Sequence, residues 1–577
     1  MACIQSGTGS RYSIIRPFMA AALAVIFSCD LGANEARDDT KSVVNKPPNI
    51  LLIVADDLGY SDLGSFGGEI DTPNLDQLAS NGGITLTNFH AAPTCSPTRS
   101  MIMSGTYNHR AGLGAMAEWT ADNQRGQPGY EGYLNDKVVA LPALLRDAGY
   151  YTFMAGKWHL GMEPEQGPHM RGFVDSFAML PGAGNHYSDK GLNAHLPVIP
   201  YRENGRAVTL PANFYSTTFY TDKAIAYIDK ARKSADKPFF GYVAYTAPHW
   251  PLQVAARYSD KYRGKYAAGY DGVKRDRLRR MVEAGVLDAK VKPYEGSECN
   301  LDWNDLPEEE QKRQARLMEV YAGMVDVLDE NIGRLIDHLK AVGEYDNTLI
   351  VFMSDNGADA RPELGLGGES EFLEKNYDNR FENIGEATSF VSYGGAWAEV
   401  GSGPFRLHKG MPTEGGIRVP AIIHLPGDER KAAIRGDFVS VMDLMPTFLE
   451  VAGAVHPGKT YKGREVFPAA GKSMLPYLAG EVAAVHDDEP YGFSVHRRQG
   501  LQIDQWKIVR LPKPYGDYTW ELYDIETDPG ETVNLAAELP DVTKKMIQRW
   551  EEFASQTGVI VSSASARVPR ECSAAPM

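Results

Sequence analysis

Short apolar runs alternate with amphipathic segments along most of the chain. The runs NILLIVADD (49–57), PFFGYVAYTAPHWP (238–251) and NTLIVFMSDNG (347–357) are apolar almost throughout and predict strands that are buried on both faces. The segments at 217–233 and 311–342 repeat apolar residues at helical spacing and predict long amphipathic helices. This alternation predicts an α/β fold in which helices cover both faces of a large sheet.

Three shorter segments extend the same pattern. TPNLDQLASNGG (72–83) predicts a helix closed by glycines, and KVVALPALLRDAGY (137–150) predicts another helix. YTFMAGKWHLG (151–161) predicts a strand. The region 358–403 is rich in glycine and long for a loop without secondary structure, which is typical of a functional lid or a disordered segment.

The pattern changes after about residue 430. Residues 437–454 still predict a helix, but 491–496, 501–511 and 520–536 predict strands and turns. We therefore expect a larger N-terminal domain at 48–430 and a smaller C-terminal α+β subdomain at 431–560.

The first 36 residues predict an export segment. Arg11 and Arg16 precede an apolar run from Phe18 to Phe27, which is long enough for a signal peptide and too short to span a bilayer. Cys29 follows this run and predicts either a lipid anchor at that residue or ordinary cleavage near Ala33–Ala36. Either way we expect an exported protein, periplasmic or at the cell surface.

Charge and cysteine content narrow the function. The chain has 59 Lys and Arg against 75 Asp and Glu, a formal net charge of −16, and no basic stripe, so nucleic-acid binding is not expected. Five cysteines are present; Cys299 and Cys572 either pair in an oxidising compartment or stay free, and Cys95 is the odd one.

Acidic residues follow two of the predicted strands. Asp56 and Asp57 end the strand at 49–57, and Asp355 and Asn356 lie at the end of the strand at 347–357. Ligands of open α/β sheets collect at the carboxyl ends of strands, and oxygen ligands without His or Cys suit Ca²⁺ or Mg²⁺. Each pair alone fits a turn or helix cap better than a cation site; two such pairs, both at the ends of very apolar strands, favour a cation site.

Cationic side chains occupy comparable places. Lys157 and His159 alternate along an extended segment, His249 follows a buried strand, and Lys409 lies beside the long loop. Together with Arg99 and a cation they would form a positive pocket in an acidic protein. Such a pocket suits a tetrahedral anion, either a sulfate or a phosphate ester. A helix expected to start after Pro97 adds free N–H groups.

The segment Cys95-Ser96-Pro97-Thr98-Arg99, with Gly105 after it, resembles the signature of type I, formylglycine-dependent sulfatases of the alkaline-phosphatase-like superfamily, of the bacterial arylsulfatase kind. ADDLGYSDLG, GKWHLG, TAPHWPLQ, SDNG and HKGMPTEGGIRVPAIIHLPG surround it in the order of that family. The resemblance runs from about residue 48 to 535. Met103-Ser104-Gly105 departs conservatively from the frequent Leu-Thr-Gly.

The resemblance implies a mechanism. A separate formylglycine-generating, or sulfatase-maturating, enzyme would oxidise Cys95 to formylglycine, whose hydrate has two hydroxyls on one carbon. One hydroxyl would attack sulfur, and loss of the proton of the other would release sulfate, so no water is needed to hydrolyse an ester of the enzyme.

The family's roles transfer residue by residue. Asp56, Asp57, Asp355, Asn356 and the modified Cys95 would bind one Ca²⁺, with Mg²⁺ as the alternative. Arg99 would hold the diol and the carboxylates. Lys157 and His159 would contact diol and sulfate, with His159 as the base in sulfate release. His249 and Lys409 would bind the sulfate and the leaving-group oxygen, one of them as acid. His408 has no matching role.

Three other functions fit parts of the pattern. A phosphate or phosphonate ester hydrolase of the same superfamily would share the fold and the diol. A non-catalytic protein that binds calcium or sulfated glycans would need no leaving-group acid. A cysteine hydrolase would need a Cys–His pair and no metal acids. The sequence leaves open the physiological sulfate ester and the oligomeric state.

Overall fold

The computed structural model describes residues 47–234, 237–362, 370–427 and 431–563. The predicted export segment, Cys29 and Cys572 lie outside these residues. Among the described residues, Cys95 is free and buried, Cys299 is disulfide-bonded, and no helix is long and apolar enough to cross a membrane.

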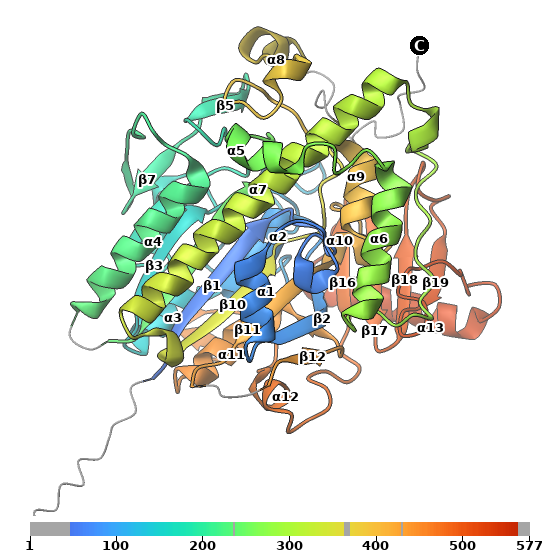
Figure 1. Ribbon diagram of the computed structural model, residues 1–577. Coiled ribbons are helices and arrows are strands. Elements are labelled where there is room, and N and C mark those ends of the chain that lie inside the picture. The colour runs from blue at the N-terminus through green and yellow to red at the C-terminus, as the bar shows by residue number, and fades with distance from the viewer. Residues whose placement is uncertain (1–46, 235–236, 363–369, 428–430, 564–577) are drawn as a thin grey trace, which may run out of the picture. The chain divides into compact units, whose positions relative to one another are not determined.

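A mixed sheet of eleven strands forms the centre of the fold (Figure 1). Its members are β1 (Asn49–Asp56), β2 (Ile84–His90), β3 (Tyr151–Lys157), β4 (Asp175–Met179), β7 (Tyr201–Glu203), β8 (Arg206–Ala207), β9 (Phe239–Pro248), β10 (Thr348–Ser354), β11 (Arg418–His424), β12 (Ala433–Arg435) and β13 (Val439–Ser440). The order is β12-β2-β11-β10-β1-β9-β3-β4-β7-β8, with β13 on β2; the run from β10 to β4 is parallel, and β11 is antiparallel to both neighbours.

The side chains of β1 explain why its sequence is apolar throughout. Leu51 and Ile53 enter one hydrophobic core, and Ile50 and Leu52 enter the core on the opposite face. Because successive side chains of a strand point to opposite faces, a strand covered on both sides needs apolar residues at every position. The predicted α/β class with a doubly covered sheet is confirmed.

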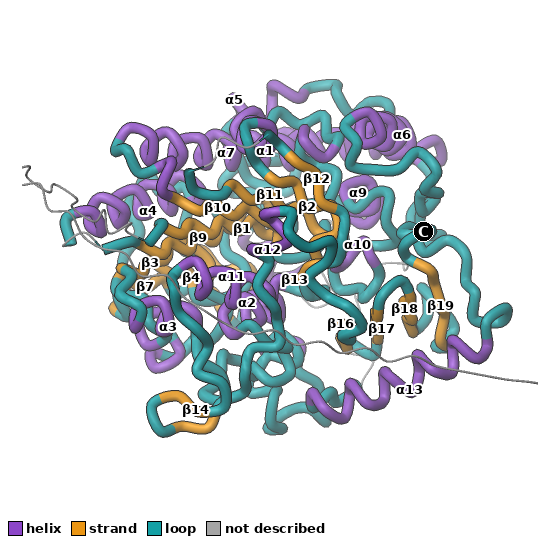
Figure 2. The backbone as a smooth tube through the Cα atoms, turned by 90° about the horizontal axis from the view of Figure 1, so that it is seen from below, coloured by secondary structure: helices purple, strands orange, loops and turns teal. Residues whose placement is uncertain are grey.

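Helices form a layer on each face of the sheet (Figure 2). α1, α4 and α7 lie on one side, and α2, α3 and α11 lie on the other. The helices are α1 (Pro73–Ser80), α2 (Cys95–Ser104), α3 (Leu141–Asp147), α4 (Ser216–Arg232), α5 (Ala256–Ser259), α6 (Gly269–Glu283), α7 (Glu308–Ala341), α8 (Ser370–Asn376), α9 (Gly394–Gly401), α10 (Glu414–Ile417), α11 (Leu444–Val451), α12 (Leu475–Ala479) and α13 (Pro540–Thr557).

A four-stranded antiparallel sheet follows near the C-terminus. It contains β16 (Tyr491–Val495), β17 (Arg498–Ile503), β18 (Trp506–Arg510) and β19 (Trp520–Asp524), in that order. Trp550 and Phe553 of α13 pack on Leu501 and Ile508 of this sheet. Two small ribbons complete the fold: β5 (Lys190–Asn193) with β6 (Leu196–Val198), and β14 (Thr460–Tyr461) with β15 (Arg464–Glu465). The boundary near residue 430 stays a prediction.

Several boundaries differ from the sequence prediction. Helix α2 begins at Cys95 itself, not after Pro97. The strand predicted for 151–161 ends at Lys157, because His159 takes a left-handed backbone conformation with φ 55°. The predicted helix at 437–454 contains β13 and the shorter α11, separated by a capping box between Ser440 and Asp443. The region 358–403 contains α8 and α9 and therefore has secondary structure of its own.

Candidate active site

The parallel pairing of β1 with β10 brings their acidic ends together. Ala55 lies opposite Ser354, and the next residue of β10's exit, Asp355, donates its backbone N–H to Ala55 at 3.1 Å. The backbone N–H of Asp57 lies 3.3 Å from Asp355 Oδ1, and Asn356 Nδ2 donates to Asp57 Oδ1 at 2.6 Å. The carboxyl ends of β1 and β10 therefore bring together the four residues predicted from the sequence, Asp56, Asp57, Asp355 and Asn356.

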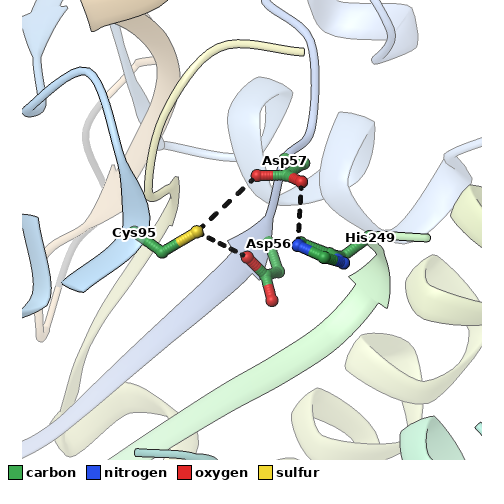
Figure 3. A group of neighbouring side chains, drawn as sticks. All are labelled: Asp56, Asp57, Cys95 and His249. Atoms are coloured by element: carbon green, nitrogen blue, oxygen red, sulfur yellow. Dashed lines mark hydrogen bonds and ion pairs between the residues drawn. The ribbon is translucent and has the colours of Figure 1, made fainter. Parts of the chain in front are cut away.

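Cys95 faces this acidic edge from the first turn of α2 (Figure 3). Its Sγ lies 3.6 Å from Asp56 Oδ1 and 3.9 Å from Asp57 Oδ1. Burial raises the pKa of the thiol well above its usual value, despite the nearby Lys157 and Lys409. The group is therefore a neutral thiol and not the thiolate that a cysteine hydrolase requires.

Arg99 lies one helical turn further along α2 and is fully buried. Its Nε and Nη2 donate to Asp355 Oδ2 at 2.9 and 2.6 Å, and its Nη1 donates to the carbonyl of Lys157 at 3.1 Å. This fork fixes the end of β3 against the end of β10. Arg99 therefore holds the carboxylate side of the site.

Two buried lysines neutralise the aspartates of β1. Lys157 Nζ donates to both oxygens of Asp56 at 2.8 and 2.6 Å. Lys409 Nζ lies between Asp57 and Asp359, at 2.8 Å from each. Burial lowers the pKa of Lys409, but Asp359 and Asp57 outweigh it and raise the pKa well above the usual value.

The backbone around Lys409 fixes this residue against the Cys95 segment. The N–H of Lys409 donates to Ala358 at 3.0 Å, and the N–H of Gly410 donates to Pro93 at 2.7 Å. Gly410 has φ 81°, a conformation that favours glycine, so the chain can turn here immediately after the lysine.

The two histidines face different partners. His249 Nε2 lies 3.4 Å from Asp57 Oδ2, and burial with the nearby Lys409 and Lys157 lowers its pKa well below the usual value. His159 Nε2 instead lies 3.0 Å from Glu118 Oε1; burial lowers the pKa of His159, Glu118 opposes this, and Lys157 and Arg99 reinforce it. The other predicted site residues therefore lie around the aspartates. His159 lies beside them but contacts a different carboxylate, that of Glu118.

The oxygens of Asp56, Asp57, Asp355 and Asn356 fit a hard divalent cation, whereas the thiol of Cys95 and the imidazole of His249, which lie beside them, are softer donors. Ligand atoms of Asp56, Asp57, Cys95 and His249 lie within 4.8 Å of one another. Burial raises the pKa of Asp56 and of Asp57, so the lysines do not fully offset the cost of burying these two negative charges. Asn356 Oδ1 is buried and has no hydrogen-bond partner among the described residues. A cation between these oxygens would supply both the missing charge and the missing partner.

Two acids of the site, Asp359 and Glu118, were not predicted from the sequence. Asp359 accepts hydrogen bonds from Lys409 and from Trp250 Nε1 at 2.9 Å, and its place three residues after Asn356 was a usable signal. Glu118 lies in a 3-10 turn (Ala117–Trp119) within an irregular segment, where no periodicity marks it. His408, left without a role, bonds to the carbonyl of Lys409 at 3.1 Å.

The fold and the site together define a hydrolase of anionic esters, and comparison with known proteins specifies it. A family model described as "Sulfatase" matches residues 48–454, and one for the C-terminal part of N-sulphoglucosamine sulphohydrolase matches 406–556. The chain is 38% identical over 461 residues to an arylsulfatase of Klebsiella aerogenes, covering 79% of this chain and 95% of that one. An uncharacterised sulfatase of Schizosaccharomyces pombe is 44% identical over 539 residues, covering 90% and 96%.

A solved structure agrees with these relatives. Ps i-CgsB, crystallised with a neocarrahexaose, superposes with a TM-score of 0.63 at 26% identity, covering 90% of this chain and 96% of that one. The chain belongs to the sulfatase family. It is a sulfuric ester hydrolase of the arylsulfatase type.

Proposed function

We propose that this sulfatase cleaves sulfate monoesters, aryl sulfates among them, with a formylglycine made from Cys95 next to a bound Ca²⁺. The setting of Cys95 carries the proposal: a buried thiol of raised pKa lies at a helix start against two aspartates, inside a ring of cationic groups. As a thiol this residue is a poor nucleophile, whereas its hydrated aldehyde would have a hydroxyl directed at the same carboxylate edge.

Asp56, Asp57, Asp355 and Asn356 would hold the cation, whose charge would offset the buried carboxylates and make a nearby hydroxyl more acidic. Lys157 and Lys409 would bind the sulfate oxygens, since each ammonium group has three N–H donors and uses two of them in its contacts with carboxylate oxygens. Arg99 would keep Asp355 and the end of β3 in place.

Proton transfer to the departing alcohol would come from Lys409 or His249. Lys409 remains protonated at neutral pH, because Asp359 and Asp57 outweigh its burial and raise its pKa. His249 is neutral at that pH, because burial lowers its pKa. We therefore assign donation to Lys409 and a hydrogen bond to the sulfate to His249.

We also propose that the chain is exported to the periplasm or cell surface and that a separate maturation enzyme converts Cys95. The export pattern of the first 36 residues and the Cys95–Arg99 signature support these two steps.

A mass spectrum of the peptide that contains residue 95, from protein made in its native host, tests the proposal. Conversion to formylglycine lowers the mass by about 18 Da relative to cysteine. An alkylatable thiol in active protein would overturn the mechanism. Rates on aryl sulfate and aryl phosphate esters, measured side by side, test the substrate, and much faster phosphate turnover would contradict it.

A further inference from the structure

Glu118 and His159 form a carboxylate–imidazole pair that the proposed roles do not use. Glu118 Oε1 lies 3.0 Å from His159 Nε2, and the Glu118 side chain is 48% exposed while His159 is 8% exposed. Since an ionised carboxylate only accepts hydrogen bonds, Nε2 must donate the proton between them. The neutral ring then has its lone pair on Nδ1.

The other ring nitrogen is free to accept a proton. His159 Nδ1 is buried and has no hydrogen-bond partner among the described residues. A side chain at position 182 would lie 2.5 Å from the ring's Cε1, so Gly182 lets the imidazole pack on the backbone. The backbone N–H of His159 donates to Leu180 at 3.1 Å, which fixes the left-handed turn that directs the ring.

The charges facing the ring are those of Glu118, Lys157 and Arg99. Burial lowers the pKa of His159, Glu118 opposes this, and the two cations reinforce it, so the imidazole is neutral at pH 7. Partial desolvation raises the pKa of the half-exposed Glu118 carboxylate, but the adjacent His159 outweighs it and lowers the pKa to about 2. Glu118 is therefore ionised whenever the enzyme is folded near neutrality.

We infer that Glu118 is a positioning residue, which holds His159 in the Nε2–H tautomer so that Nδ1 serves as the proton acceptor of the site. A proton taken up at Nδ1 converts the imidazole to imidazolium, whose charge the Glu118 carboxylate balances, and it returns to water before the next turnover. The role of Nδ1 as proton acceptor rests on the proposed function, because it needs the sulfatase reaction. The tautomer does not, because it follows from the contact between Glu118 and His159 Nε2.

The test is Glu118→Gln, which preserves the size of the side chain and removes its charge. We expect kcat on an aryl sulfate to fall roughly 10- to 100-fold with little change in KM. In the wild type the Glu118 carboxylate raises the pKa of His159, so removing its charge lowers that pKa. The acid limb of the kcat/KM profile should therefore move to lower pH. Asp122→Asn is the matched control, since Asp122 is a fully exposed acid of the same segment whose one ion pair within the described residues is with Arg125; it should change neither kcat nor the pH profile.

Nitrogen NMR of ¹⁵N-histidine-labelled protein gives a readout without activity. The measurement uses protein in which Cys95 is unconverted, and the His159 signal is the one that disappears in His159→Gln. This signal should show the Nε2–H form in the wild type and a mixture of tautomers in Glu118→Gln. A raised KM with unchanged kcat would mean that Glu118 binds substrate, and unchanged kinetics with an unchanged signal would mean a surface contact; either overturns the inference. Converted wild-type protein inactive on every sulfate ester would instead contradict the proposed function.

Discussion

At the scale of single residues, the site consists of charges that are stable only in one another's presence. Asp57 accepts hydrogen bonds from Lys409 and Asn356, and Lys409 in turn depends on Asp359. Removing one member of such a set leaves a buried charge without its partner, and an unpaired buried charge is strongly destabilising. Asp359 is the member of this set that was not predicted from the sequence. It accepts a hydrogen bond from Lys409.

Asp359→Asn should therefore impair the reaction through Lys409. The ammonium would lose one of its two anionic partners, its pKa would fall toward the usual value, and its position would loosen. We expect kcat/KM on an aryl sulfate to fall roughly 10- to 100-fold, the usual effect of losing an outer-shell partner. Steady-state kinetics measure this, with Asp337→Asn as control because Asp337 is an exposed acid that, in the part of the chain that the structure describes, forms an ion pair with Lys340 alone. Equal kinetics for both variants would contradict the role assigned to Asp359.

At the scale of elements, the C-terminal sheet holds the Lys409 loop, which we define as residues 402–413. Arg406 of this loop donates to Glu521 of β19 at 2.7 Å, and Arg498 of β17 donates to the carbonyl of Gly410 at 3.0 Å. Directly after the loop, Glu414 at the start of α10 bonds to Lys507 of β18 at 2.6 Å. Three strands of the smaller sheet thus fix the segment that brings Lys409 into the site.

Glu531 completes this contact between elements. It accepts the backbone N–H of Glu414 at 2.9 Å and lies 3.1 Å from Lys507 Nζ. Burial raises the pKa of Glu531 to about 7, which Lys507 opposes and Glu414 reinforces. A carboxyl group whose pKa is raised by folding contributes stability below its unfolded pKa and loses it as pH rises toward the folded value.

Glu531→Gln should remove that pH dependence. Glutamine keeps an oxygen for the Glu414 N–H and never ionises, so the melting temperature of the variant relative to wild type should increase between about pH 4.5 and 7. Differential scanning calorimetry at pH 5 and pH 8 measures the difference. Glu526→Gln, at an exposed position of the same segment, is the control. If the melting temperature of the wild type instead rose relative to that of Glu531→Gln as pH increased, Glu531 would be ionised over the whole pH range, which contradicts the prediction.

At the scale of the whole molecule, the candidate cation site joins segments that lie far apart in sequence. Asp57 and Asp355 are 298 positions apart, and Cys95 enters from a third segment. A cation bound there would cross-link the ends of β1 and β10 and the start of α2. It would stabilise the folded state, since the unfolded chain does not hold these ligands together.

Calcium removal should therefore lower the melting temperature of the entire protein. At a calcium concentration a thousandfold above Kd the stabilisation is about 4 kcal/mol. Burial raises the pKa of Asp56 and Asp57, so in cation-free protein their contribution to stability is lost as pH rises above about 4, and the calcium-induced shift should grow with pH. Thermal melts with EDTA and with added Ca²⁺ measure it, and Asp57→Asn should reduce the shift. Identical melts with and without calcium would contradict the site.

The sequence by itself determined the elements and the residue types of the site. The apolar run of β1 requires burial on both faces, and the helical spacing of 311–342 corresponds to α7 (Glu308–Ala341). Because parallel strands end at one edge of a sheet, the sequence predicts that Asp56, Asp57, Asp355 and Asn356 lie close together.

Only the tertiary structure decided which charges pair. His159 leaves the line of β3 through a left-handed turn and meets Glu118. The half-buried Asp359 and the buried Glu531 become partners of lysines from other segments. Periodicity reflects which face of an element is covered, but it carries no information on contacts between residues from different elements. The tuning of His159 and Lys409 therefore depends on packing, because burial and neighbouring charge set a pKa and both arise only when the chain folds.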